Sequence, residues 1–305
     1  MRIAVSGTTG LIGSAVAARL AKGNEIVCIG RHAGADRIVD FSNPNSVEAL
    51  DLSGVAALIH CAGIVDEDFR ADPAVAFRQA TLGAEALVRR AVAGGVSRIA
   101  YISSAHVYGP MRAMPDESSP VNPLSNYAIA HFASEQILRR SASAFIKAAV
   151  FRPNAVFGIP PSLAGFRRWA LIPFAFPRAA LEHSAIVLKS NGLQWRNFVA
   201  AADVAEVVAR WLAREDLMGF SPFNPVGAHS MSVLAFAQLC AQVAEELTGR
   251  PCAVRHAGGG KSEAFDYRTL HQFCHGTANL RSTIRSLLQA LQKEAAMNTV
   301  DESTR

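Results

Sequence analysis

Three glycines stand within one seven-residue stretch, Gly7-Thr8-Thr9-Gly10-Leu11-Ile12-Gly13, directly after an apolar run at residues 3–6. Amphipathic positions follow at once as far as Leu20, so the stretch joins a strand to a helix. Glycines let such a turn tighten and let a phosphate approach the backbone, while the helix N-terminus stabilises negative charge. A tight turn without a ligand is the alternative. The strand-turn-helix context favours a dinucleotide site.

Short apolar runs rich in β-branched residues recur at residues 25–29, 56–60 and 98–103, and helical periods separate them. Runs of this kind are typical of strands that are buried on both faces. Strands that alternate with helices predict an α/β fold with a doubly wound parallel sheet, the Rossmann architecture.

The second half of the chain shows a different pattern. Residues 158–194 are rich in proline and aromatic residues with little periodicity, which suggests an insertion on the substrate side. Amphipathic helices are predicted at 230–247, with a stop at Gly249, and at 280–291. We therefore expect a Rossmann domain at 1–157, to which 197–222 returns. A smaller C-terminal substrate-binding part covers 158–196 and 223–296, and a disordered tail covers 297–305.

The composition excludes several classes of protein. Of the 305 residues, half are hydrophobic and 18% are charged, as in soluble globular chains. No apolar run approaches the ~20 residues of a membrane span, and no leader precedes the first strand, so we expect a cytoplasmic protein. The five cysteines have neither CxxC nor metal-ligand spacing, so we expect reduced thiols and no metal site.

The formal charge of +5 favours anionic partners. Lysines and arginines are scattered, with no aromatic-basic stripe, so an anionic cofactor and an anionic small substrate are favoured over nucleic acid.

The second strand ends at Cys28-Ile29-Gly30-Arg31, where a cofactor-binding chain of this type selects its ribose. A carboxylate at this point would accept hydrogen bonds from the ribose of NAD. Arg31 instead offers a guanidinium for a 2′-phosphate, which favours NADP and leaves NAD possible. The alternative is a solvated surface arginine.

Further motifs follow in a fixed order along the chain. They are His60-Cys61-Ala62-Gly63, residues 103–109 (SSAHVYG), Pro123 to Tyr127, residues 152–158 (RPNAVFG), and Arg196-Asn197-Phe198-Val199 leading to Asp203-Val204-Ala205. From Arg2 to about Leu291 the chain resembles the extended short-chain dehydrogenase/reductases, also called the NAD-dependent epimerase/dehydratase family, of the nucleotide-sugar type. The resemblance implies a nucleotide-diphosphate sugar as substrate and a homodimer formed through two long helices of each subunit.

The resemblance assigns catalytic roles to Ser104 and Tyr127. In the family a serine polarises the reacting oxygen and the tyrosine transfers its proton, as hydride transfer at a carbon that bears oxygen requires. A lysine four residues after the tyrosine lowers the tyrosine pKa and holds the nicotinamide ribose, and here His131 stands in its place. Residues i and i+4 share a helix face, so His131 can still point toward the ribose.

The exchange of lysine for His131 is the main departure from the family pattern. An imidazole with its ordinary pKa of ~6.5 is largely neutral at neutral pH, and its charge can switch within the physiological range. We therefore expect catalysis that is weakened, pH-gated or absent.

Two further departures bear on the reaction. Ala80 stands where the family often has an asparagine that supports the active-site helix. Dehydratases carry an Asp-Glu pair directly after the catalytic serine, whereas this chain has Ala105 and His106. Without an acid to expel hydroxide, 4,6-dehydration is not expected.

The resemblance also implies two sets of binding residues. The cofactor set comprises Gly7, Thr9, Gly10, Leu11, Ile12, Gly13, Arg31, Asp40, Phe41, Ala62, Gly63, Tyr127, His131 and Pro153. The substrate set comprises Ser104, His106, Asn154 and Arg196, of which Arg196 matches an arginine that holds the substrate diphosphate.

Two assignments stay open. Asp40 either bonds the adenine amino group or forms an Asx turn at a strand end. Arg167, Arg168 and Arg178 flank an apolar stretch, Trp169 to Pro177, that suits core or lid packing. These arginines are assigned to a solvated rim, with a diphosphate contact as the alternative. For the apolar stretch, the alternative to core or lid packing is an apolar surface that binds a second subunit or a lipid-linked substrate.

These observations predict an NAD(P)-dependent oxidoreductase or epimerase that acts on a nucleotide-linked sugar, of the 4-ketoreductase or 4-epimerase type. A catalytically weak or inactive NAD(P)-binding sensor or scaffold is the alternative, because His131 replaces the usual lysine.

Overall fold

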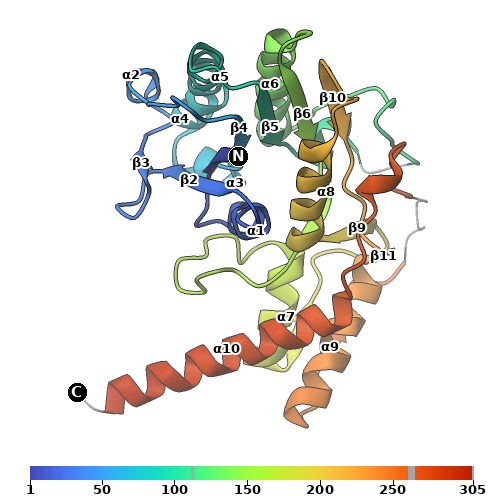
Figure 1. The fold of residues 1–305 in the computed structure, drawn as a ribbon. Helices are drawn as coiled ribbons and strands as arrows, with labels where there is room; N and C mark the ends of the chain where they lie inside the picture. Colours follow the sequence, from blue (N-terminus) through green and yellow to red (C-terminus); the bar gives the residue numbers. More distant parts are fainter. Residues whose placement is uncertain (111–112, 260–264, 304–305) are drawn as a thin grey trace.

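A seven-stranded sheet forms the centre of the computed structural model, which describes residues 1–110, 113–259 and 265–303 (Figure 1). Its strand order is β10-β6-β5-β4-β1-β2-β3, and every neighbouring pair is parallel. The strands are β1 (Arg2–Ser6), β2 (Glu25–Gly30), β3 (Arg37–Ile38), β4 (Ala57–His60), β5 (Arg98–Ile102), β6 (Lys147–Phe151) and β10 (Phe220–Phe223). The predicted parallel α/β fold is confirmed.

Helices cover both faces of this sheet (Figure 1). They are α1 (Leu11–Leu20), α2 (Pro44–Glu48), α3 (Asp66–Ala71), α4 (Pro73–Arg78), η1 (Gln79–Gly83), α5 (Ala84–Ala93), η2 (Ala105–Tyr108), α6 (Asn126–Ser141) and α8 (Ala201–Ala213). Alternate strand residues face opposite sides. Ile3 and Val5 pack in a cluster with residues of α1 and α8, whereas Ala4 packs in a cluster with residues of α2 and α5.

A second core lies in the C-terminal part of the chain. Its elements are β7 (Ala155–Phe157), α7 (Ile172–His183), β8 (Ala185–Val187), β9 (Trp195–Ala200), β11 (His229–Ser232), α9 (Val233–Thr248), β12 (Ala253–Arg255), η3 (Gln272–Cys274) and α10 (Leu280–Ser303). Strands β11, β9 and β7 form one small sheet, and β12 and β8 form another. Phe198 of β9 stacks on Phe236 of α9 with ring centroids 4.4 Å apart.

The segment 197–222 contributes to both parts. Most of it passes through β9, which belongs to the small sheet, and through α8, which packs on α1. It then enters β10 at the edge of the central sheet. The proposed division of the chain into two domains stays a prediction.

Three boundaries differ from those expected. The predicted helix at 230–247 begins at Val233, because residues 229–232 pair with β9 and the Ser232 hydroxyl caps the helix, and it ends at Gly249 as predicted. The segment 158–194, which has little periodicity, contains helix α7, whose Pro173 lies in the first turn, where proline is tolerated.

Helix α10 continues to Ser303 although disorder was expected from residue 297, because no glycine or proline interrupts the chain after Leu280. It extends beyond the rest of the fold (Figure 1). Residues 304 and 305 of the expected tail lie outside the described residues.

All five cysteines are free thiols, and three of them, Cys240, Cys252 and Cys274, are buried. Within the described ranges no helix combines the length and the apolar character that crossing a membrane requires.

A buried ion pair joins α6 to the end of β6. The carboxylate of Glu135 accepts from Nε of Arg152 at 3.0 Å and from Nη2 at 2.6 Å, and neither residue is more than 5% exposed. The Ser103 hydroxyl donates to the same carboxylate at 2.6 Å, and Arg152 donates to the Tyr108 hydroxyl at 2.9 Å. These bonds fix helix α6 relative to the loop that follows β5.

Removing one partner of this pair should strongly destabilise the fold, because the other charge stays buried without compensation. We expect Glu135→Ala to lower the free energy of unfolding by about 3–5 kcal/mol. Glu85→Ala breaks the exposed pair between Arg140 and Glu85 and should cost at most about 1 kcal/mol. Urea unfolding of both variants measures the difference, and equal losses would contradict a structural role for the buried pair.

Candidate functional site

The glycine turn between β1 and α1 has the geometry of an anion-binding loop. Gly7 has a φ of +69°, and a Cβ on Gly13 would lie 2.1 Å from the Gly7 carbonyl oxygen, so both positions require glycine. Gly10 precedes α1, and no side chain of the described residues caps that helix. The amide groups at the start of α1, beside the exposed Thr9, are therefore free to bind a pyrophosphate.

The loop after β4 lies against this turn. A Cβ on Gly7 would meet the Ala62 nitrogen at 2.8 Å. Ser6 fixes the loop, because its hydroxyl accepts from the backbone of Cys61 and Ala62 at 3.0 Å each and contacts Nδ1 of His60 at 2.8 Å. Gln79 donates to the Ala62 carbonyl at 3.1 Å. Ser6 and Gln79 were not predicted, because their roles depend on neighbours far away in the chain.

The residues expected near the adenosine end lie after β2 and β3. Arg31 is exposed at the end of β2. The Asp40 carboxylate accepts from the backbone and the hydroxyl of Ser42, so an Asx turn is present. Phe41 is buried, and its ring makes a T-shaped contact with the His60 ring, with centroids 5.0 Å apart. An adenine contact by Asp40 stays a prediction.

Helix α6 carries Tyr127 and His131. The Ser125 hydroxyl caps its start, so Tyr127 lies in the first turn and His131 one turn later, with ring centroids 4.4 Å apart. His131 is 3% exposed, and its Nδ1 contacts the Tyr101 hydroxyl at 2.6 Å. Tyr101 on β5 was not predicted, since only the fold brings the strand and the helix together.

Burial lowers the pKa of His131 to about 3, and the positive charge of Arg168 contributes. His131 is therefore neutral at physiological pH. The pH-gated alternative is therefore disfavoured, because the side chain lies between the sheet and α6 instead of reaching solvent, while weakened or absent catalysis stays a prediction. The lysine position of the resemblance consequently holds no positive charge.

Ser104 and His106 lie beside Tyr127. Ser104 is buried and precedes η2, where its hydroxyl accepts from the His106 amide at 3.2 Å. The His106 ring meets the Tyr127 ring edge-on, with centroids 5.8 Å apart. Enclosure lowers the pKa of His106, and the charges of Arg196 and Arg168 lower it further. His106 thus links the Ser104 hydroxyl to the Tyr127 ring, and Arg196 is near enough for its charge to act on His106.

The two remaining predicted residues follow β6. The Pro153 carbonyl accepts from the Ala105 amide at 3.0 Å, which holds the Pro153-Asn154 segment against η2. Asn154 is half-buried. Burial lowers the pKa of Arg196 on β9, whose guanidinium donates to the Trp195 carbonyl at 2.7 Å.

Ala80 lies in η1, a single π-helical turn. Its side chain is buried, and its carbonyl accepts from the Ser134 hydroxyl at 2.8 Å. This bond links η1 to the helix that carries Tyr127. The backbone carbonyl of Ala80 and the side-chain amide of Gln79 therefore make the supporting bonds, although no asparagine side chain is present at position 80.

Arg168, which was expected on a solvated rim with a diphosphate contact as the alternative, lies near Tyr127. Its guanidinium carbon lies 5.9 Å from the centroid of the Tyr127 ring. Among the described residues no group of three or more potential metal ligands is present.

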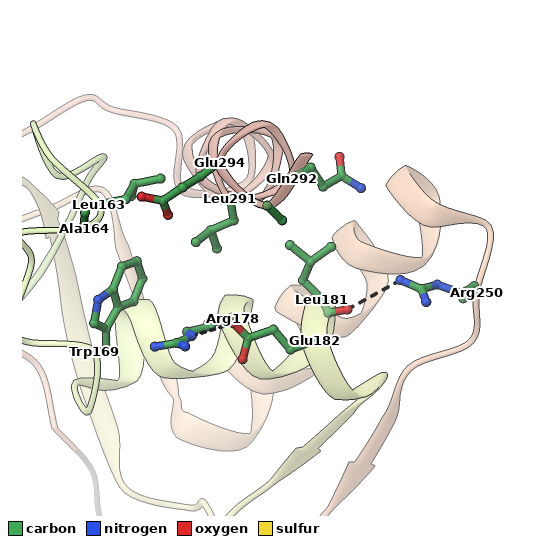
Figure 2. Close-up of a pocket in the computed structure, with 11 residues that line it drawn as sticks. Leu163, Ala164, Trp169, Arg178, Leu181, Glu182, Arg250, Leu291, Gln292 and Glu294 are labelled. Carbon is green, nitrogen blue, oxygen red and sulfur yellow. Dashed lines mark hydrogen bonds and ion pairs between the residues drawn. The ribbon is translucent and has the colours of Figure 1, made fainter. Parts of the chain in front are cut away.

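A cavity of about 710 Å³ lies elsewhere, between α7, α10 and the segment that precedes α7 (Figure 2). The Trp169 ring and the apolar side chains of Leu181 and Leu291 line it, and Arg178 stacks over Trp169 at 5.2 Å. None of the predicted site residues lines this cavity.

Comparison with known proteins places this arrangement among related folds. The model of the NAD dependent epimerase/dehydratase family matches residues 3–219. MoeE5 in complex with UDP-glucose and NAD has a TM-score of 0.78 at 20% identity, covering 97% of this chain and 100% of that chain. The UDP-glucose 4-epimerase of Thermotoga maritima, with UDP-glucose, has a TM-score of 0.78 at 18% identity, covering 97% and 100%. RMD from Pseudomonas aeruginosa, complexed with NADPH, has a TM-score of 0.75 at 21% identity, covering 94% and 97%.

The neutral state of His131 predicts how stability depends on pH. The unfolded residue binds a proton below its ordinary pKa of ~6.5, whereas the folded residue does so only near about 3. Stability is therefore lost as the pH falls between these values, and His131 alone should contribute about 2 kcal/mol of loss between about pH 7 and about pH 5.

His131→Gln should reduce this loss by that amount in urea unfolding at the two pH values. His256→Gln, at an exposed position, is the control and should keep the pH dependence of the natural chain. If His131→Gln leaves the dependence unchanged, the imidazole is not held neutral by the fold.

Proposed function

Because this chain belongs to the NAD dependent epimerase/dehydratase family, we propose that it is an NAD(P)-dependent epimerase or reductase acting on a nucleotide-linked sugar, of the 4-epimerase or 4-ketoreductase type. The observation that carries the proposal is that His106 connects three of the predicted groups. Its ring lies edge-on to the Tyr127 ring, its amide donates to the Ser104 hydroxyl, and the charge of Arg196 lowers its pKa. This supports a site that combines the proton-transfer group, the oxygen-polarising group and the phosphate-binding group of such a reaction.

The residues present fit a dinucleotide. The Gly7 and Gly13 positions leave no room for a Cβ, and the start of α1 offers backbone amides, as a pyrophosphate requires. Ala62 adjoins this turn, and Gly63 lies against the His131 ring. Tyr127 would face the nicotinamide ribose, whereas His131 is buried behind it. When bound, the cofactor would accept or return a hydride at the sugar carbon.

The side chains of this chain would perform the proton chemistry. Tyr127 takes a proton from the sugar hydroxyl during oxidation or gives one to the keto oxygen during reduction. The Ser104 hydroxyl hydrogen-bonds the same oxygen and stabilises the charge that develops there. The guanidinium of Arg196 suits a substrate diphosphate, and His106 and Asn154 complete the substrate side.

The cofactor preference rests on Arg31. Its exposed guanidinium at the end of β2 supports NADP(H), while the family description and the NAD-bound relative MoeE5 support NAD. A dehydratase activity is not proposed, because Ala105 and His106 supply no carboxylic acid next to Ser104.

A second candidate is a catalytically weak or inactive NAD(P)-binding sensor or scaffold. The buried, neutral His131 favours it, because the charge of the usual lysine is absent from that position. A homodimer formed through two long helices of each subunit, and a cytoplasmic location, stay predictions.

Tyr127→Phe tests the proposed function against this second candidate. Only the phenolic oxygen is lost, so cofactor binding should persist while turnover of a panel of sugar nucleotides falls about 100-fold or more. Nicotinamide absorbance and formation of an epimer measure turnover. Tyr267→Phe is the control, because it removes a hydroxyl that donates to the Arg152 carbonyl and should cost stability, not turnover. Equal turnover of Tyr127→Phe and the natural chain would exclude Tyr127 as the proton-transfer group.

Arg31→Asp tests the cofactor preference. The natural chain should bind NADP(H) more tightly than NAD(H), and the variant should lose about 10-fold or more in NADP(H) affinity, because a carboxylate repels the 2′-phosphate. Arg255→Asp makes the same charge change at an exposed position in the C-terminal part and should leave the preference intact. Titration calorimetry measures the affinities for both cofactors. Equal affinities for NADP(H) and NAD(H) in the natural chain would contradict the binding of the 2′-phosphate by Arg31.

A further inference from the structure

Helix α6 places no cation within one turn of Tyr127, since its arginines, Arg139 and Arg140, lie in the last turn. The residue one turn later is His131, which burial keeps neutral, and its ring occupies the space beside Tyr127. A tyrosine that transfers protons benefits from a nearby positive charge, which favours the phenolate and lowers the energy of the charged form. The chain therefore needs this charge from another element if Tyr127 is the proton-transfer group of the proposed function.

Arg168 brings a positive charge to this ring from a different part of the chain. It belongs to the segment between β7 and α7, and its guanidinium carbon lies 5.9 Å from the Tyr127 ring centroid. Its side chain is 28% exposed, so solvent screens its charge only in part. The same charge lowers the pKa values of His131 and His106, the two rings that contact Tyr127.

Acidic residues at the start of α3 hold Arg168 in this position. The guanidinium lies 3.8 Å from the Asp66 carboxylate and 3.9 Å from the Glu67 carboxylate. Both distances exceed hydrogen-bond length, and Nε of Arg168 is buried without a hydrogen-bond partner among the described residues. The attraction of the two carboxylates thus keeps the guanidinium between α3 and the Tyr127 ring.

The neighbouring residue shows that the segment itself is anchored. Nη2 of Arg167 donates to the Asp68 carboxylate at 2.9 Å. Two successive arginines, 167 and 168, therefore pair with three successive acidic residues, 66–68. Leu163 and Trp169 of the same segment pack in one apolar cluster with Leu11 of the glycine turn. Arg168 is therefore presented by a segment that is fixed at both α1 and α3.

We propose that Arg168, positioned by Asp66 and Glu67, supplies the positive charge that stabilises the ionised form of Tyr127, in place of the lysine that the family carries at position 131. The proposal rests on Tyr127 being the proton-transfer group of the proposed function. It makes Arg168 a positioning residue for the charge on Tyr127, not a surface residue of the rim.

Several charged or titratable groups surround the phenol and enter the design of a test. On α6 and η2 these are His131 and His106, on β5 Tyr101, on β9 Arg196, on α3 Asp66 and Glu67, and on the segment before α7 Arg168. His106 and His131 are neutral above their lowered pKa values, so in the alkaline range the charges that remain are those of the arginines and the carboxylates.

Ultraviolet titration of tyrosinate reports Tyr127 directly, without substrate. The chain has four tyrosines, and burial raises the pKa of Tyr101, Tyr108 and Tyr267. The transition that disappears in Tyr127→Phe identifies Tyr127 in the titration curve.

Arg168→Met should move the tyrosinate transition of Tyr127 upward by about one pH unit, because the phenolate loses its neighbouring cation. Arg168→Lys should keep it near its natural position. Arg167→Met is the matched control, since it removes the adjacent arginine, which pairs with Asp68, and should leave the transition in place.

Activity in the oxidative direction adds a second measurement. If Tyr127 is the proton-transfer group, the rate should rise with pH, and Arg168→Met should shift this rise to higher pH. An unchanged tyrosinate titration in Arg168→Met, or an equal shift in Arg167→Met, would overturn the proposal. If the titration shifts as expected but Tyr127→Phe retains turnover, the charge coupling stands and the proposed function fails.

Discussion

The bidentate bond between Glu135 and Arg152 is the interaction on which the arrangement of the site depends. It joins α6 to the end of β6 in a region that excludes water, and Ser103 and Tyr108 complete its hydrogen bonds. Tyr127 lies on α6 and Ser104 directly follows Ser103. A shift of α6 along the sheet would therefore change the distance between Tyr127 and Ser104, which the proposed reaction requires to act on one oxygen atom.

Local sequence could predict the parallel sheet and the glycine turn, because each depends on neighbouring residues. The apolar runs around Ile3 and Leu58 pack on both faces, and the conformation of Gly7 follows from its own residue type. The boundaries of α7 and α10 were less predictable. Helix α7 starts within a stretch that has no clear period, and the end of α10 depends on the absence of a breaker.

The surroundings of His131 could not be predicted from spacing alone. The i, i+4 relation places His131 near Tyr127, and this proximity is present in the structure. Whether the imidazole reaches solvent depends on Tyr101, which is 30 residues away in the chain and meets it through the packing of α6 on the sheet. Arg168 likewise lies far from Tyr127 in sequence, so no local pattern connects its charge with the phenol.

The π-helical turn η1 divides what would otherwise be one helical rod from Pro73 to Ala93. Ala76 before the turn and Ala80 within it pack toward Ala130 of α6, whereas Leu87 after the turn packs toward the sheet. A π turn admits one extra residue and rotates everything that follows about the helix axis. The length of the π turn from Gln79 to Gly83 thus sets the rotation of α5 about the helix axis relative to α4. One continuous helical segment can therefore pack against the site before the turn and against the core after it.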